Sequence, residues 1–418
     1  MNGPLVENTP VVFTTRTAYS LPAQKFMIPT NWKRYQLSQL INKALSLARP
    51  IPFDFLIHGE ILRTSLGEWR LGKGIGEEDT LEIEYFESVL PPQRMATLPH
   101  EDWVSSISCR IPQYFLTSSY DGHVRIFDYS QKLVRDIPAH PAPITSVCLV
   151  PTPGATEDSL LIASASHDLT ACLVKVSLEP DAPSTSKALA SLHLHTLPLS
   201  LIGFWDTTIP LEDEVMVESG DRKKRRRVTG SQSDHPKRKS PINVLRSHTG
   251  RVSRALFSPS SSQKAYSCGF DSTVRAWDVE LGICVHTINV PERPMLDLAV
   301  TQGGDIALAS STDRTVSIFD FRSSSLSSTS GTLMHPTTPS CLVCADSNKS
   351  QIITGSYDGT ARLWDLRSTR GAVASFKAWD GSMKILSVDW VGDVVGVAGE
   401  GGVEVWRVGQ GDIMATTK

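Results

Sequence analysis

The sequence predicts a mixed fold, in which a small α+β domain precedes a larger domain built from β-strands. Two observations lead to this prediction. Over the first 90 residues, alternating strand-like patterns surround one segment with helical spacing. From residue 99 onwards a nine-residue pattern recurs, in which a polar turn with an aspartate precedes an alternating strand that ends in an aromatic residue and a second aspartate.

The N-terminal domain is expected over residues 10–90, after a flexible tail at 1–9 and before a linker at 91–98. Its elements follow the order ββαβ(β)β, which is that of a ubiquitin-like β-grasp domain. Pro50 and Pro52 end the helix. In chain order, we expect strands at residues 10–17 and 25–28, a helix at 35–45, strands at 53–57 and 61–62, a turn-rich stretch at 67–79 and a last strand at 80–85.

The recurring pattern of the second domain has a regular period. Its clear copies begin at Tyr120, Phe270, Thr312 and Tyr357. The aromatic positions at 277, 319, 364 and, in a degenerate copy, 406 lie 42, 45 and 42 residues apart. A period near 40–45 residues with this signature is typical of a WD-repeat β-propeller with four strands in each blade. The sequence therefore predicts an all-β propeller of nominally seven blades over residues 99–418, and a protein that presents loops to partners rather than an enzyme.

Blade three is predicted to be truncated. Residues 195–200 have the form of a blade start, and residues 201–206, which follow directly, have the form of a third strand. Val174 and Trp205 are 31 residues apart, whereas a complete blade needs about 40. We expect that about 25–30 residues, which cover most of the first two strands, are missing. A skipped exon or an error in the gene model would produce such a gap.

Three side chains of blade four are expected to form a structural network. His248, Asp271 and Trp277 are placed to hydrogen-bond one another across the strands. Buried polar groups need partners, and positions that repeat with the blade are better explained by packing than by catalysis. We find no phosphate-binding loop, HExxH or GxSxG motif, and we expect no catalytic residue and no cofactor of the protein's own.

Composition restricts further the class of protein to which this chain can belong. The chain has 418 residues, a net charge of −3 and seven cysteines without framework spacing, as expected of reduced thiols inside a cell. A zinc site at Cys341 and Cys344 is disfavoured, because residues three apart in a strand point to opposite faces. No apolar stretch of about 18 residues exists, so no membrane span is expected. The N-terminus lacks the basic flank and apolar core of a signal peptide.

Positive charge is concentrated in an insert at residues 207–243, which is expected to be disordered because it is polar and charge-blocked. Outside residues 222–239 the chain carries a net charge of −11. Two basic clusters are typical of a bipartite nuclear localisation signal, although a solvated loop or an auxiliary RNA contact are alternatives. The clusters are Arg222, Lys223, Lys224, Arg225, Arg226 and Arg227, followed by Lys237, Arg238 and Lys239.

The first 130 residues carry a specific resemblance. The segments at residues 52–66, 90–92 and 100–106, followed by seven blades, resemble the fungal WD-repeat ribosome-biogenesis proteins of the PeBoW-type complex. The resemblance implies a nucleolar and nucleoplasmic scaffold needed for pre-rRNA processing and for maturation of the large ribosomal subunit. It also implies three partners in pre-ribosomal particles: a block-of-proliferation-type WD-repeat protein bound by the propeller, a pescadillo-type protein, and the AAA ATPase midasin.

In this family, a glutamate of the ubiquitin-like domain completes the coordination of Mg²⁺ in midasin's adhesion site, so that the ATPase can release the complex from the particle. The resemblance places that ligand at Glu78, with Glu77 as the runner-up. On spacing alone, the acidic turn at residues 76–79 is better explained as a merely solvated turn.

Two other classes of protein remain as alternatives. A notchless-like protein would use the same docking at a later step, but it has eight blades rather than the seven counted here. A substrate receptor of cullin ubiquitin ligases would carry a WDxR-type signature, which Phe319-Asp-Phe-Arg322 and Trp364-Asp-Leu-Arg367 fit.

Overall fold

The computed structural model describes residues 7–47, 49–76, 78–88, 91–151, 159–178, 186–194, 201–210, 213–214, 236–290, 292–322, 331–346 and 350–409. Its contacts divide the chain into two compact units, the first centred on residues 1–93 and the second containing residues 94–362 and 376–406. In the described residues, no helix is long and apolar enough to cross a membrane.

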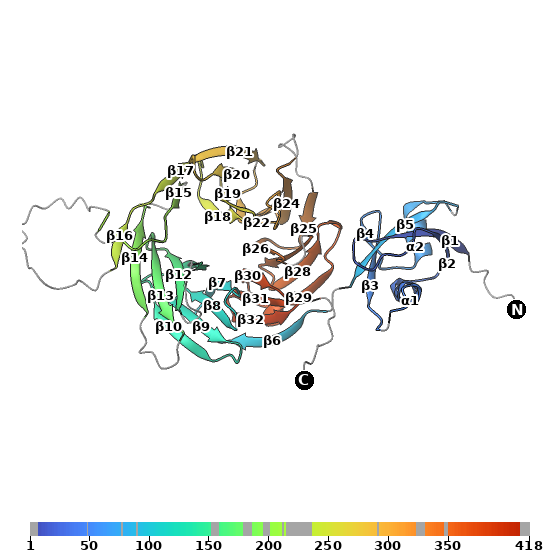
Figure 1. Ribbon diagram of the computed structural model, residues 1–418, viewed down its shortest axis with the longest axis horizontal. Helices are drawn as coiled ribbons and strands as arrows, with labels where there is room; N and C mark the ends of the chain where they lie inside the picture. Colours follow the sequence, from blue (N-terminus) through green and yellow to red (C-terminus); the bar gives the residue numbers. More distant parts are fainter. Residues whose placement is uncertain are drawn as a thin grey trace, which may run out of the picture. The chain divides into compact units, whose positions relative to one another are not determined.

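The N-terminal unit is a ubiquitin-like β-grasp domain (Figure 1). Its sheet has the order β2-β1-β5-β3-β4, in which β1 and β5 run parallel. Leu37 and Ile41 of the first helix pack on this sheet, and Tyr85 meets Phe13 and Phe53 edge-on in the core. The elements are β1 (Asn8–Thr14), β2 (Lys25–Pro29), α1 (Arg34–Ala44), β3 (Phe53–Ile57), β4 (Glu60–Ile61), α2 (Leu66–Lys73) and β5 (Leu81–Glu87).

Helix α2 corrects the expectation of a turn-rich stretch at residues 67–79. Gly67 and Gly72 suggested turns, but a capping box starts the helix before them. Ser65 Oγ accepts a hydrogen bond from the backbone of Glu68, and the Glu68 carboxylate accepts one from the backbone of Ser65. Both bonds satisfy N–H groups that the first helical turn would otherwise leave without partners. The Ser-x-x-Glu pattern was therefore the visible signal for this helix.

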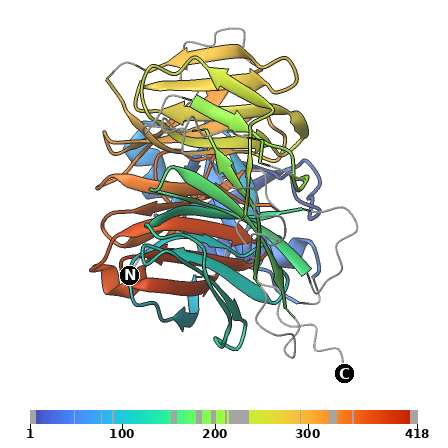
Figure 2. The same cartoon turned by 90° about the vertical axis from the view of Figure 1, so that its left-hand side faces the viewer.

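The second unit is a ring of sheets arranged around a centre (Figure 1). Figure 2 shows the same ring from the side of blades two and three. Blades one and two contain β7 (Val104–Ser108), β8 (Tyr114–Ser119), β9 (His123–Asp128) and β10 (Leu133–Pro138), then β11 (Ile144–Val150), β12 (Ser159–Ser166), β13 (Thr170–Ser177) and β14 (Lys187–His193). Blade four contains β18 (Val252–Ser258), β19 (Ser261–Gly269), β20 (Thr273–Asp278) and β21 (Ile283–Asn289).

Blades five to seven have the same four-stranded form. They contain β22 (Met295–Val300), β23 (Ile306–Ser311), β24 (Thr315–Asp320) and β25 (Gly331–Met334), then β26 (Pro339–Cys344), β27 (Gln351–Ser356), β28 (Thr360–Asp365) and β29 (Ala374–Lys377), and finally β30 (Ile385–Val391), β31 (Val394–Gly399) and β32 (Gly402–Arg407). The fourth strand of the last sheet is β6 (Gln93–Leu98), which precedes blade one in the chain. Arg94 of β6 forms an ion pair with Glu404 of β32 at 3.0 Å. This pairing joins the two ends of the propeller and covers a strand edge.

Blade three is truncated, as the sequence predicts. It consists of β15 (Leu201–Phe204) and β17 (Asn243–Arg246), which form a two-stranded antiparallel sheet. Among the described residues, the other edge of β15 pairs with no strand. The first strands of the complete blades pack side by side in the order β18, β22, β26, β30, β7 and β11. The series ends at β11 of blade two, next to the truncated blade three. Residues 195–200, the expected blade start, lie outside the described residues.

The expectation of disorder throughout residues 207–243 is wrong at its C-terminal end. Lys237–Lys239 form β16, which pairs in parallel with β14 and adds a fifth strand to blade two. An ion pair between the Lys239 ammonium and the Asp206 carboxylate holds the strand in place. The Arg238 backbone also donates to the Asp213 carboxylate at 2.8 Å. These contacts come from acidic residues distant in sequence, so the local composition did not reveal them.

Candidate docking site

The loop between α2 and β5 carries Glu78, the residue at which the family resemblance places the metal ligand. Helix α2 ends at Lys73 and is capped by Gly74, which adopts a left-handed φ of +66° that favours glycine. The backbone N–H of Ile75 donates to the Arg70 carbonyl at 3.2 Å, and the N–H of Gly76 donates to the Asp79 carboxylate at 3.1 Å. The loop therefore leaves the helix in a defined conformation.

The Arg70 side chain connects this loop to the sheet. Its side chain is buried, at 4% exposure. The guanidinium donates to the Gly76 carbonyl and, at 2.5 Å, to the hydroxyl of Thr9 in β1. A guanidinium offers five donors in a rigid plane, so it can tie the loop to the sheet through two bonds at once. The sequence analysis did not identify this role of Arg70.

Glu78 itself is exposed. Within the described residues it makes no hydrogen bond and no ion pair, so its carboxylate is available to another molecule. A carboxylate oxygen is a preferred ligand of Mg²⁺, and a partner that holds the ion needs only one such group from this chain. Glu77, the runner-up, lies outside the described residues. In those residues, no cluster of histidine, cysteine and acidic side chains could hold a metal ion.

The blade-four network is present and contains a fourth member. His248 Nδ1 lies 2.9 Å from the Asp271 carboxylate, and His248 Nε2 lies 2.7 Å from the Ser267 hydroxyl. The Trp277 indole N–H donates to the same hydroxyl at 2.8 Å. Burial lowers the pKa of His248, so the imidazole is neutral at pH 7 and can donate to Asp271 while accepting from Ser267. Ser267 is thus the link that the sequence analysis missed.

The same arrangement recurs in other blades, which supports a structural role. In blade two, His140 contacts Asp168 at 3.0 Å and Ser164 at 2.9 Å. In blades one and six, His100 and His335 each lie 2.9 Å from a threonine hydroxyl of the second strand. In these four blades the histidine fixes the segment that leads into the first strand to the second strand of the same blade.

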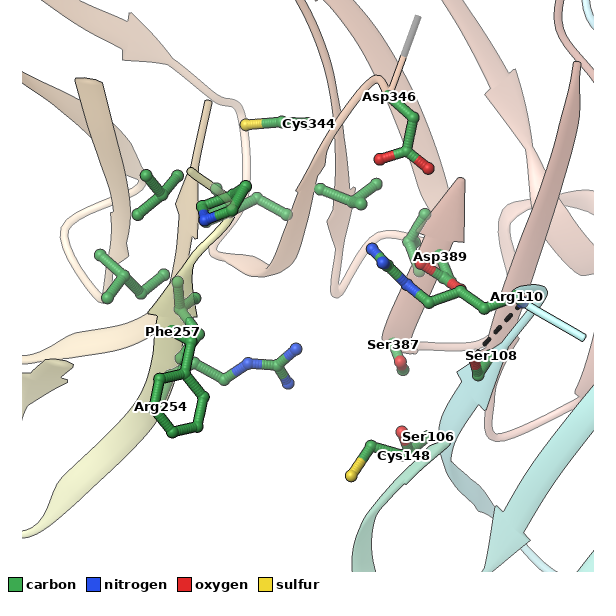
Figure 3. A pocket seen from close by; sticks show the side chains of 18 of the residues that line it. Ser106, Ser108, Arg110, Cys148, Arg254, Phe257, Cys344, Asp346, Ser387 and Asp389 are labelled. Carbon is green, nitrogen blue, oxygen red and sulfur yellow. Dashed lines mark hydrogen bonds between the residues drawn. The ribbon is translucent and has the colours of Figure 1, made fainter. Parts of the chain in front are cut away.

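A cavity of about 610 Å³ lies where the inner strands meet (Figure 3). Arg110 and Arg254 reach into it from different blades. Two buried carboxylates bind backbone N–H groups of the next blade: Asp389, which lines the cavity, accepts from Cys109 at 2.8 Å, and Asp297 of blade five accepts from Leu342 at 2.9 Å. These carboxylates tie neighbouring blades together, which accounts for their burial.

The two basic clusters differ in what the structure describes. Residues 222–227 lie outside the described residues. The second cluster is a strand in which the Lys239 side chain is only 3% exposed. The arginines of the two WDxR-type sequences each bind the aspartate two residues earlier, with Arg322 to Asp320 at 2.8 Å and Arg367 to Asp365 at 2.6 Å.

The fold defines a WD-repeat protein with an N-terminal ubiquitin-like domain. Family models agree: residues 10–69 match the NLE (NUC135) domain, and residues 92–128, 239–278 and 328–365 match the WD domain, G-beta repeat. The chain is 55% identical to the ribosome biogenesis protein YTM1 of Laccaria bicolor, over 97% of this chain and 96% of the relative. It is 51% identical to that of Coprinopsis cinerea over 96% and 95%, and 32% identical to that of Aspergillus fumigatus over 91% and 86%.

The chain therefore belongs to the YTM1 family of ribosome biogenesis proteins, and ribosome biogenesis is the process in which it takes part. The match to the Laccaria bicolor relative spans 432 positions and 97% of this chain of 418 residues, or about 405 residues. About 27 positions of the match thus have no residue in this chain. That number agrees with the length expected to be missing from blade three.

Proposed function

We propose that this protein is a non-catalytic scaffold for pre-rRNA processing and large-subunit maturation, whose ubiquitin-like domain docks to the metal site of the AAA ATPase midasin through Glu78. The observation that supports the proposal most is the exposed Glu78 carboxylate on a loop that Arg70 holds in place. A loop whose backbone is held in place loses little conformational freedom on binding, so more of the coordination energy is available for affinity.

In this scheme the propeller keeps the docking domain on the particle by binding a block-of-proliferation-type WD-repeat protein, which in turn brings a pescadillo-type protein into the complex. ATP-driven movement of midasin then pulls the complex from the pre-ribosome. This chain supplies the attachment point, and the ATPase supplies the energy.

A pull-down with the adhesion-site domain of midasin in Mg²⁺ tests the docking step. Glu78→Ala removes the ligand, and Glu78→Asp moves the carboxylate back by one methylene, so both variants should lose binding. Glu82→Ala is the matched control, because Glu82 is an exposed glutamate of the adjoining strand β5. Normal binding by both Glu78 variants would refute the assignment.

We further propose that the basic residues 222–227 and Lys237–Lys239 direct the protein to the nucleus and nucleolus. The rest of the chain has a net charge of −11 and offers no comparable basic segment. Neutralising residues 222–227 together with Lys237 and Arg238, while keeping Lys239 because it is buried and paired with Asp206, should move the protein toward the cytoplasm without weakening the propeller's binding to its partner in vitro. Nuclear retention of this variant, in cells that lack the block-of-proliferation-type partner, would show that the signal lies elsewhere.

A further inference from the structure

Six pairs of residues lie at one end of the central channel of the propeller. Each complete blade has one such pair. One member precedes the turn between the second and third strands, and the other leads into the first strand. The backbone N–H of the former donates to the carbonyl of the latter. Both positions lie at the same end of their strands, so the pairs surround one mouth of the channel. The pairs are Trp103 with Tyr120, Pro143 with His167, Arg251 with Phe270, Pro294 with Thr312, Thr338 with Tyr357 and Lys384 with Glu400.

Large aromatic side chains are exposed at this mouth. Trp103, Phe270 and Tyr357 are 42%, 44% and 43% exposed, and they come from blades one, four and six. The ring centroids of Trp103 and Tyr120 lie 5.9 Å apart. Burial raises the pKa of Tyr120, and Tyr357 and Arg251, from two other blades, act on the same phenol electrostatically. The aromatic side chains therefore converge over the mouth instead of being scattered over the disc.

Arg251 supplies the available positive charge at this mouth. Its guanidinium lies 5.8 Å from the centroid of the Phe270 ring, and within the described residues it forms no ion pair. Lys384, by contrast, is paired with Glu400 at 3.1 Å. A guanidinium held over an aromatic ring and free of carboxylates can bind a carboxylate from another molecule in a partly dry contact.

Arginines form ion pairs with three of the turn aspartates, and histidines hydrogen-bond the other two. Their partners are Arg125 for Asp121, His140 for Asp168, His248 for Asp271, Arg293 for Asp313 and Arg362 for Asp358. The remaining exposed acids, Glu101, Asp102 and Glu292, would repel a phosphate backbone. A surface that is aromatic, carries exposed acids and has one available arginine suits a protein loop better than a nucleic acid.

We propose that this mouth surface, formed by Trp103, Tyr120, Arg251, Phe270 and Tyr357, is where the propeller holds its protein partner. The occupant is a partner loop that places an apolar side chain among the aromatic rings and a carboxylate on Arg251. This inference rests on the proposed function, in which the propeller binds a block-of-proliferation-type protein, and it names the surface that does so.

The test is titration calorimetry of the full chain with the purified block-of-proliferation-type partner. Trp103→Ala, Tyr357→Ala and Arg251→Glu should each weaken binding about tenfold or more, as expected of buried interface anchors. Tyr129→Ala is the matched control, because Tyr129 is an exposed aromatic residue in blade one that follows the opposite end of β9 from Tyr120. Its affinity should stay within about twofold of the wild type, as expected for a residue outside the interface.

Each other outcome is decisive. If the wild-type chain does not bind the partner at all, the proposed function fails and this inference fails with it. If the wild type binds and all three mouth variants bind equally well, the surface assignment alone is wrong. It is also wrong if the variants keep the partner but lose self-association in sedimentation or lose retention of single-stranded RNA, since a second copy or RNA would then be the occupant.

Discussion

Completing blade three should stabilise the propeller. The perturbation is insertion, after Ser200, of the first two strands of a blade with their aspartate turn, which can be copied from residues 252–272 of blade four. Where these strands are missing, an apolar pocket of about 180 Å³ lies between β15 and blade four, lined by Ile202, Phe204, Leu245, Phe257 and Trp277 among others. Phe257 is 52% exposed there.

The structure sets the size of the effect. Filling a cavity of this volume contributes up to about 4 kcal/mol at about 24 cal/mol per Å³. The buried indole N–H of Trp205 has no hydrogen-bond partner among the described residues, and a partner would contribute about 1–3 kcal/mol more. Ordering the inserted strands offsets part of this gain, so we expect the melting temperature to rise by about 5–10 °C.

Differential scanning calorimetry of the two proteins measures this change, and partner affinity should rise in parallel. A glycine–serine insert of equal length is the control, because it adds residues without filling the pocket. Equal melting temperatures and equal affinities for the original chain and the completed one would show that the missing strands are dispensable, and the reasoning about blade three would be refuted.

Three further predictions follow from individual contacts. Arg70→Ala removes the hydrogen bond to the Gly76 carbonyl, so midasin docking should weaken although Glu78 is intact. The amides of the loop should also lose protection from hydrogen exchange. Unchanged docking would contradict this prediction. Asp206→Asn should free β16, so that trypsin cleaves after Lys239 faster than in the wild type, and equal cleavage would show that the ion pair does not hold the strand. Burial lowers the pKa of His335 to about 4, so its contribution to stability is complete above about pH 6.5 and is lost as the pH falls toward 4; a melting temperature with the same pH dependence in His335→Asn would exclude this residue as the cause.

The sequence predicted the elements whose signals are local. The repeat period and the aspartate turns predicted the blades, and the distance between Val174 and Trp205 predicted the truncation. Helix α2 was missed because the pattern of residues 67–79 indicates turns, although Ser65 and Glu68 form a capping box at its start. Strand β16 was missed for a different reason. The Lys-Arg-Lys segment becomes a strand by pairing with the edge of β14 and by the ion pair of Lys239 with Asp206, and neither contact is visible in the local sequence.

In the candidate site, too, features with a local sequence signal were predicted and features that depend on distant residues were not. An acidic turn before the last strand marked Glu78 as exposed, and the structure places it so. No local pattern could reveal that Arg70 would be buried and would tie the loop to Thr9, which is 61 residues away in the chain. Ser267 was equally invisible, because its role depends on the approach of His248 and Trp277 from other strands.

The central claim is that a single carboxylate of this chain completes a metal site in another protein. Glu78→Gln tests it most directly, because the substitution keeps the size of the side chain and removes the charge. In a titration of the whole chain with the adhesion-site domain of midasin, the account predicts measurable affinity for the wild type in Mg²⁺, loss of that affinity with a chelator, and no binding by Glu78→Gln under either condition. Binding by Glu78→Gln that equals the wild type and still depends on Mg²⁺ would contradict the account.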